Sequence, residues 1–193
     1  MKSLMNKYNY PITLKENDAM KILIVLMAMI CFTTLHCGCG GKELKVGDKA
    51  PAFELENQDG NMVKLSDFLG KKVALYFYPA DSTPGCTQQA CSLRDAFDDL
   101  RDAGITILGL SKGSVKSKQK FIKKQHLNFP LLIATEDTLK AYGVNHGFLH
   151  FLFRTPQRHT FLIDENGIIV AIIKNVNTKN HAQQIIDAFN AAT

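Results

Sequence analysis

The sequence lacks the features that mark several specialised classes of protein. Its 193 residues include 6 prolines and 13 glycines, too few for a collagen-like or low-complexity chain. It contains no internal repeat and no glycine-rich loop of the kind that binds nucleotide phosphates. The length fits one domain with a sizeable core and is short for two.

Cysteine is scarce and unevenly placed. Of the five cysteines, Cys31, Cys37 and Cys39 lie in or just after an apolar N-terminal run, whereas Cys86 and Cys91 stand alone in the body of the chain. An odd and clustered set does not resemble the disulfide framework of a small secreted domain.

The formal net charge of +5 raises the question of nucleic-acid binding. No basic groove with interleaved aromatic residues accompanies this charge, so we predict no nucleic-acid partner. The densest group of lysines is interpreted as the solvated face of one helix: Lys112, Lys116, Lys118, Lys120, Lys123 and Lys124.

Residues 1–41 are interpreted as a signal peptide or a membrane or lipid anchor, outside the folded domain. Met20 and Lys21 precede an uncharged apolar run, 22–35, which is followed by small residues and cysteines. The run is shorter than the ~20 residues that cross a bilayer as a helix, and its flanks are typical of a signal peptide. Met20 is an alternative start to Met1, because the residues between them make a long and polar leader.

Several fates of this segment remain open. Lipoprotein signals end in a small residue before the cysteine that is lipidated; Gly38-Cys39 fits that rule in part and His36-Cys37 less well. Simple cleavage and an uncleaved anchor are the alternatives. We expect an exported or membrane-associated protein on the periplasmic side, or a cytoplasmic one if the segment is not used. A zinc site at His36, Cys37 and Cys39 is disfavoured, because the segment offers no ordered set of four ligands.

Residues 45–193 are predicted to form one domain. Strands are expected at 53–56, 62–65, 73–78, 105–110, 129–134, 160–163 and 168–173, with helices from Gly85 to Gly104 and at 115–126, 136–142 and 178–192. This order predicts an α/β fold, a mixed central sheet flanked by helices.

Cys86 lies where the buried strand 73–78 meets the first turn of a helix. Unpaired N–H groups and the positive end of the helix dipole stabilise a thiolate at such a position, and the thiolate is the form of cysteine that attacks. Thr83 can point its hydroxyl into the same pocket, and Pro79 stiffens the approach. A free cysteine most often serves as a small buried hydrophobe; the spacing of Pro79, Thr83 and Cys86 favours the catalytic interpretation.

Three separated motifs resemble those of the peroxiredoxins. Pro79-x-x-x-Thr83-x-x-Cys86 resembles their active-site motif, and the string TPGCT followed by Cys91 is similar to the Q-type branch, the bacterioferritin comigratory proteins. Residues 46–53 resemble the opening of that family, and residues 158–164 resemble its arginine-bearing strand. The resemblance implies a thioredoxin-like fold and thiol-dependent reduction of hydrogen peroxide and organic hydroperoxides.

The resemblance also implies roles for individual residues. Cys86 is the peroxidatic cysteine, Thr83 orients the peroxide, Arg158 stabilises the thiolate and the developing charge, and Pro79 shields the pocket. Arginine suits this task because it keeps its proton and its fork fits two adjacent oxygens. Without the motif, Arg158 would be interpreted as a surface salt-bridge partner.

Cys91 occupies the resolving position of many Q-type members, the alternative being a core residue of the helix. It would condense with the sulfenic acid that attack on peroxide leaves on Cys86. Cysteines five positions apart on a regular helix lie roughly 8–9 Å apart at Cα, too far for a disulfide, so we predict that the first helical turns unwind. A thioredoxin-like dithiol protein would then reduce the enzyme, and no metal, haem or nucleotide cofactor is implied.

One segment departs from the family pattern. Between Gly143 and Arg158, apolar residues stand where related chains carry a more polar loop: Phe148, Leu149, Phe151, Leu152 and Phe153. Core packing and an apolar rim for a bulky hydroperoxide, a membrane or a partner subunit both remain open. We expect a monomer or a weak dimer.

Two other functions are alternatives to peroxide reduction. Thiol–disulfide oxidoreductases of this fold usually place two cysteines two residues apart, whereas four residues separate Cys86 from Cys91. A non-catalytic binding protein on an ancestral fold is the second rival, and the presence of Thr83, Cys86 and Arg158 together argues against it.

Overall fold

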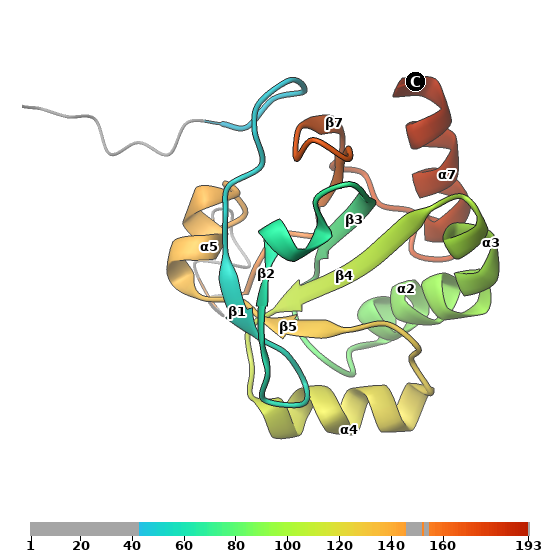
Figure 1. Ribbon diagram of the computed structural model, residues 1–193. Helices are drawn as coiled ribbons and strands as arrows, with labels where there is room; N and C mark the ends of the chain where they lie inside the picture. Colours follow the sequence, from blue (N-terminus) through green and yellow to red (C-terminus); the bar gives the residue numbers. More distant parts are fainter. Residues whose placement is uncertain (1–42, 146–151, 153–154, 193) are drawn as a thin grey trace, which may run out of the picture. The chain divides into compact units, whose positions relative to one another are not determined.

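A five-stranded mixed sheet forms the centre of the computed structural model, which describes residues 43–145, 152 and 155–192 (Figure 1). The strands are β3 (Lys72–Phe77), β4 (Ile105–Ser111), β5 (Leu131–Ile133), β6 (Thr160–Ile163) and β7 (Ile169–Ile173). Their order is β5-β4-β3-β6-β7. β3, β4 and β5 run parallel, and β6 is antiparallel to both β3 and β7. The predicted mixed sheet is confirmed.

The central strand β3 is buried on both faces, as its continuous apolar sequence predicts. Its close pairing with β4 depends on Gly109, which lies opposite Tyr76. A Cβ atom at Gly109 would lie 2.7 Å from the phenol oxygen of Tyr76 and 2.6 Å from Cδ2 of Leu131. Glycine is therefore required at this position so that the ring of Tyr76 can cross the neighbouring strand.

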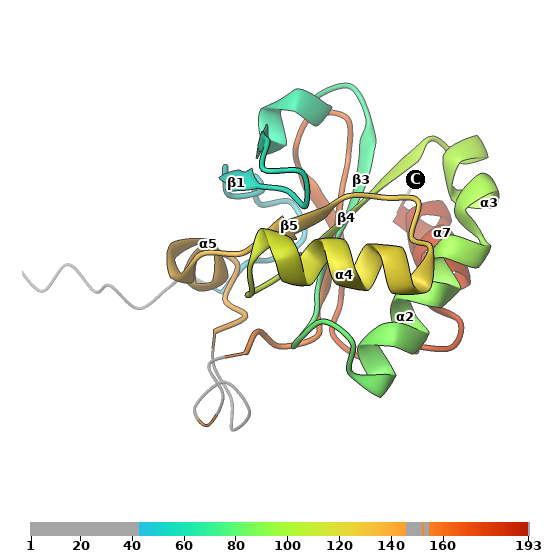
Figure 2. The same cartoon turned by 90° about the horizontal axis from the view of Figure 1, so that it is seen from below.

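Helices cover one face of the sheet. They are α2 (Pro84–Asp95), α3 (Phe97–Asp102), α4 (Val115–Gln125) and α7 (His181–Ala192). Their apolar side chains, among them Leu93, Phe121 and Ile185, pack with Tyr76 and Cys86 in one core cluster. Figure 2 shows α2, α3 and α7 together on this side of the sheet.

The opposite face is covered by a hairpin, a short 3-10 helix and one more helix. These elements are β1 (Glu54–Glu56), β2 (Met62–Lys64), η1 (Leu65–Phe68) and α5 (Glu136–Ala141). In Figure 2, α5 and β1 lie on the side of the sheet away from α2. β1 and β2 pair antiparallel, which confirms the predicted hairpin. In its turn the side chain of Asn57 accepts from the backbone N–H groups of Asp59 and Asn61.

Two details of the predicted helices are wrong. The helix expected between Gly85 and Gly104 is interrupted at Ala96, whose φ of −105° and ψ of 23° separate α2 from α3. Lys118 does not belong to the solvated face of α4: its side chain is 0% exposed. An uncompensated charge would be costly at this depth, so Lys118 requires partners, which it finds near Cys86.

The predicted signal or anchor segment, residues 1–41, lies outside the described residues, as do all the apolar residues of 148–153 except Leu152. Leu152 is 51% exposed. Within the described part of the chain, no helix combines the length and apolar character that a membrane span requires.

Candidate active site

Cys86 occupies the first turn of α2, which follows the end of β3 after a loop at 78–83. Thr83 is the N-cap residue of this helix and Pro84 its first residue, where the missing N–H group costs nothing. The side chain of Cys86 is buried, at 1% exposed. The sulfur therefore lies at the positive end of the α2 dipole, among N–H groups that have no partner within the helix.

The loop that leads into α2 is held in an unusual conformation. Ser82 has a φ of 63°, in the left-handed region that residues other than glycine rarely adopt. The hydroxyl of Thr83 makes no cap bond to the helix and donates to the carbonyl oxygen of Ala80 at 3.3 Å. Pro79, half-buried, follows the last buried residue of the strand segment, Tyr78. Thr83 therefore stands at the N-terminus of the helix that carries Cys86, and Pro79 lies earlier in the same loop.

Arg158 contacts the sulfur of Cys86 directly. Its Nη2 group donates to Sγ at 3.2 Å, although 72 positions separate the two residues in sequence. Arg158 lies just before β6, and β6 pairs antiparallel with β3, whose end leads to Cys86. The backbone N–H of Phe77 also donates to the carbonyl of His159, which extends this pairing up to the arginine.

Gln89 and His181, which sequence analysis did not identify, hold the guanidinium of Arg158 through hydrogen bonds. Nη1 of Arg158 donates to Oε1 of Gln89, and Nε2 of Gln89 lies 3.1 Å from Nδ1 of His181. Nε2 of His181 lies 3.0 Å from the hydroxyl of Thr160. Burial, with a smaller contribution from the charge of Arg158, lowers the pKa of His181 to about 3. The imidazole is therefore neutral at physiological pH and holds Gln89 through a hydrogen bond.

A second buried cluster joins the loop before Cys86 to α4. Nζ of Lys118 lies 2.9 Å from Oδ1 of Asp81 and 3.1 Å from the hydroxyl of Tyr78, and it also donates to the hydroxyl of Ser111. The side chains of Lys118 and Asp81 are 0% and 9% exposed. Burial lowers the pKa of Lys118, and the neighbouring carboxylate of Asp81 opposes that shift. Sequence analysis missed this cluster because helical periodicity does not identify a paired inward lysine.

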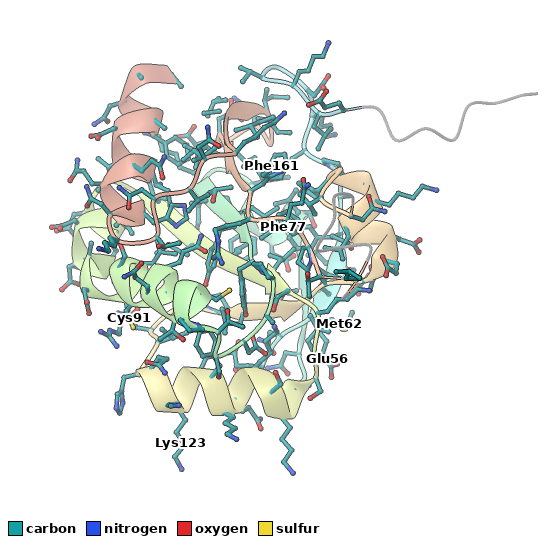
Figure 3. The ribbon with its side chains drawn as sticks, turned by 180° about the vertical axis from the view of Figure 1, so that it is seen from behind. Glu56, Met62, Phe77, Cys91, Lys123 and Phe161 are labelled. Atoms are coloured by element: carbon teal, nitrogen blue, oxygen red, sulfur yellow. The ribbon has the colours of Figure 1, made fainter. Side chains whose placement is uncertain are left out.

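Cys91 lies on the same helix as Cys86 but faces α4 (Figure 3). Its sulfur is half-buried and lies 3.8 Å from Oε1 of Gln125. The guanidinium of Arg94, one turn further along α2, donates to the backbone carbonyl of the same Gln125. Both cysteines are free. Because both belong to one continuous helix, their Cα atoms lie roughly 8–9 Å apart, beyond the reach of a disulfide.

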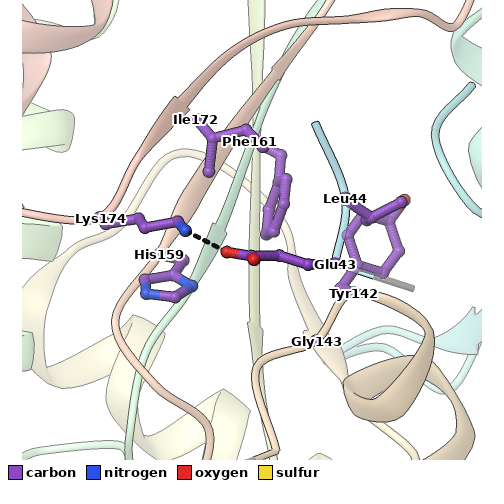
Figure 4. Close-up of a pocket in the computed structure, with 8 residues that line it drawn as sticks. All are labelled: Glu43, Leu44, Tyr142, Gly143, His159, Phe161, Ile172 and Lys174. Atoms are coloured by element: carbon purple, nitrogen blue, oxygen red, sulfur yellow. Dashed lines mark hydrogen bonds and ion pairs between the residues drawn. The ribbon is translucent and has the colours of Figure 1, made fainter. Parts of the chain in front are cut away.

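Two of the cavities formed by the described residues lie on the face of the sheet away from this site. One, of about 40 Å³, is bordered by Tyr142, Phe161 and the ion pair between Lys174 and Glu43 (Figure 4). The other, of about 320 Å³, is lined in part by Leu65 and other residues of the same face. Tyr142, Phe161 and Leu65 belong to the core cluster on the face of the sheet opposite Cys86. These cavities therefore do not give a substrate access to the sulfur.

No group of three or more potential metal ligands gathers among the residues that the structure describes. The arrangement around Cys86 instead supplies a thiol, a permanent positive charge and a helix N-terminus. Together they favour the negative charge that a thiol carries when it reacts as a nucleophile.

Comparison with known proteins gives matches over most of the domain. A sequence model described as the AhpC/TSA family matches residues 46–172. Putative peroxiredoxin bcp of Coxiella burnetii is 44% identical over 146 residues, which cover 74% of this chain and 97% of that protein. Peroxiredoxin Bcp of Escherichia coli K12 is 41% identical over 148 residues, which cover 75% of this chain and 94% of that protein.

Solved structures agree with these matches. Xylella fastidiosa PrxQ aligns with a TM-score of 0.72 at 29% identity, covering 78% of this chain and 98% of that one. Peroxidoxin BcpB from Mycobacterium tuberculosis aligns with a TM-score of 0.69 at 30% identity, covering 77% of this chain and 98% of that one. The Xanthomonas campestris bacterioferritin comigratory protein aligns with a TM-score of 0.66 at 29% identity, covering 73% of this chain and 92% of that one.

Proposed function

The chain belongs to the AhpC/TSA family as a thiol-dependent peroxidase of the peroxiredoxin type, and we propose that Cys86 is the thiol that attacks the hydroperoxide. The single observation that carries this assignment is the contact between Nη2 of Arg158 and the buried Sγ of Cys86 at 3.2 Å. A cationic partner at the N-terminus of a helix favours the thiolate over the thiol.

The first step is a displacement at the O–O bond. The thiolate of Cys86 attacks one peroxide oxygen, an S–O bond forms and the O–O bond breaks. The second oxygen leaves with the electron pair, takes up a proton and departs as water or an alcohol. The sulfur is oxidised by two electrons to a sulfenic acid and the peroxide is reduced by two electrons.

Arg158 stabilises this step electrostatically. Its positively charged guanidinium faces the sulfur, so it stabilises both the attacking thiolate and the charge that develops on the leaving oxygen. We assign Thr83 the orientation of the peroxide through its hydroxyl, and Pro79 the exclusion of water from the sulfur. The hydrogen bonds from Arg158 through Gln89 to His181 fix the orientation of the guanidinium.

Cys91 is proposed as the resolving thiol. It attacks the sulfenic sulfur of Cys86, a disulfide forms and water leaves. The first turns of α2 must unwind for this step, because the two cysteines belong to one helix. A thioredoxin-like dithiol protein then reduces the disulfide by thiol–disulfide exchange. No cofactor takes part in this scheme.

Hydrogen peroxide and organic hydroperoxides are the proposed substrates. The Xanthomonas campestris relative is described by its alkyl peroxide reduction activity, which supports the organic class.

We place the peroxidase domain at residues 45–193 and propose that residues 1–41 act as a targeting or anchoring segment. Fractionation of cells, together with mass spectrometry of the purified protein, tests that proposal, since a protein found only in the soluble cytoplasmic fraction with an unprocessed and unlipidated N-terminus would contradict it.

The assignment of the two cysteines is tested by mass spectrometry after one equivalent of hydrogen peroxide is added to the reduced chain. Wild type should yield a peptide pair joined between Cys86 and Cys91. Cys91→Ser should stop at an oxidised Cys86 that a thiol-trapping reagent labels, and Cys86→Ser should leave Cys91 reduced. Oxidation that starts at Cys91 in the Cys86→Ser protein would contradict the assignment.

A further inference from the structure

The outer face of α4 carries positive charge alone. The helix sequence VKSKQKFIKKQ contains five lysines and no acidic residue. Lys118 points inward and is paired with Asp81. The other four, Lys116, Lys120, Lys123 and Lys124, are exposed. Within the described residues, none of these four has a carboxylate within ion-pair distance; they are called the α4 lysine face below.

This face leads to the sulfur that must be reduced. At the C-terminal end of α4, the side chain of Gln125 contacts Sγ of Cys91. The guanidinium of Arg94 donates a hydrogen bond to the backbone carbonyl of the same Gln125. Figure 3 shows Cys91 above this end of α4 and Lys123 projecting away from the body of the domain. Asp95, the acidic residue next to Arg94, is engaged in an ion pair with it.

Cys91 is also the more accessible of the two cysteines. Its side chain is half-buried, whereas Cys86 is 1% exposed behind Arg158. A protein reductant that approaches the Cys86–Cys91 disulfide over α4 therefore reaches the sulfur of Cys91 while its own surface lies against the α4 lysine face. Opposite charges on two surfaces steer such an encounter and raise the association rate, an effect that salt weakens.

We propose that the α4 lysine face is the docking surface for the dithiol reductant, and that this reductant is a protein with an acidic surface around its reactive cysteine. This inference rests on the proposed function and on Cys91 as the resolving thiol.

In the exchange, a thiolate of the reductant attacks Sγ of Cys91, and the disulfide breaks. Cys86 leaves as a thiolate and returns to Arg158 as α2 reforms. The second thiol of the reductant attacks the mixed disulfide and releases Cys91, so that two electrons and two protons pass from the reductant to the enzyme.

The test compares two reductants with the full-length chain: an acidic thioredoxin and the small neutral dithiol dithiothreitol. The variant carries Lys120→Glu, Lys123→Glu and Lys124→Glu. A matched control carries Lys45→Glu, Lys49→Glu and Lys71→Glu, which make the same change of charge at exposed lysines outside α4. Turnover of hydrogen peroxide is measured at ~0.01 M salt and at ~0.15 M salt, where charges are screened beyond about 8 Å.

The proposal expects kcat/KM for the thioredoxin to fall at least ~10-fold in the α4 variant at low salt, and the salt dependence of wild type to be lost. Turnover with dithiothreitol should stay unchanged, and the control should behave as wild type with both reductants. Equal losses in variant and control, or a parallel loss with dithiothreitol, would overturn the proposal.

A membrane surface is the competing partner for a basic helix. Sedimentation with vesicles that contain anionic phosphatidylserine distinguishes the two: loss of vesicle binding in the α4 variant with unchanged thioredoxin kinetics would overturn the reductant proposal in favour of lipid. Absence of peroxide turnover with either reductant in wild type would remove the proposed function, and this inference with it.

Discussion

Nη2 of Arg158 lies 3.2 Å from Sγ of Cys86, and the same guanidinium donates from Nη1 to Gln89 three residues further along α2. One arginine therefore contacts two successive positions on the same face of the helix. This arrangement leaves little freedom for the guanidinium to turn away from the sulfur. Because β6 pairs with the central strand β3, the contact is a consequence of the sheet order.

Loss of the charge at Arg158 should impair the first chemical step. Arg158→Met is expected to lower kcat/KM for hydrogen peroxide by about 10²–10³-fold, the cost typical of removing one donor to developing negative charge. Stopped-flow consumption of peroxide measures it. Arg158→Lys keeps the charge but not the two-point contact, and should fall between wild type and Arg158→Met. Equal activity in all three proteins would contradict the role of the guanidinium.

Removing one partner of the buried pair Lys118–Asp81 should lower the free energy of unfolding more than removing both. Lys118→Met leaves the carboxylate of Asp81 without its ammonium partner, and should lower the free energy of unfolding by about 3–5 kcal/mol. The double variant Lys118→Met/Asp81→Asn removes both charges and should recover most of this loss in urea unfolding. Lys123→Met, at an exposed position of the same helix, should change stability by less than about 0.5 kcal/mol. Identical losses in the single and double variants would show that charge pairing is not the cause.

His181 should make the protein less stable in mild acid. Its pKa of about 3 in the folded state lies below the value of about 6.5 in an unfolded chain, so the unfolded state binds a proton first as the pH falls. Stability is therefore lost between about pH 6.5 and pH 3, by roughly 2 kcal/mol at pH 5. His181→Gln should show a smaller loss than wild type in urea unfolding between about pH 7.5 and pH 5.

An independent measurement checks the same group in the wild-type protein. The imidazole resonances of His181 should not titrate between about pH 7.5 and pH 5. A midpoint near 6.5 would contradict a buried and neutral His181, whatever the stability of the variant.

Formation of the disulfide should loosen the beginning of α2. In the reduced protein the helix is continuous from Pro84 to Asp95, whereas a bond between Cys86 and Cys91 is incompatible with that geometry. Amide hydrogen exchange from Cys86 to Cys91 should therefore speed up on oxidation, while the amides of β3 stay protected. Oxidised Cys91→Ser provides the control without a disulfide. Equal protection in the oxidised and reduced wild type would contradict unwinding.

The sequence was sufficient to predict those parts of the site that depend on local strand, turn and helix patterns or on the family resemblance. The apolar run of β3 and the turn signal before Cys86 predict a helix N-terminus at the sulfur, and the family resemblance pointed to Arg158. The supporting residues could not be predicted in this way. Lys118 on a lysine-rich helix has the pattern of a solvent-facing residue, and only the tertiary position of Asp81 explains why it turns inward.

Gln89 and His181 illustrate the same limit. Gln89 lies one helical turn after Cys86, so helix geometry alone could have marked it as a neighbour of the site. His181 lies 92 positions from Gln89 and reaches it only because α7 packs beside α2 on one face of the sheet. Contacts of that kind depend on topology and not on spacing in the chain.

The most direct test of the account is stopped-flow consumption of hydrogen peroxide by the full chain in excess dithiothreitol, with wild type, Cys86→Ser and Cys91→Ser compared side by side. We predict rapid consumption by wild type, loss of catalysis in Cys86→Ser, and a fast first turnover in Cys91→Ser. Peroxide consumption that survives in Cys86→Ser at the wild-type rate would contradict the central claim that Cys86 is the attacking thiol.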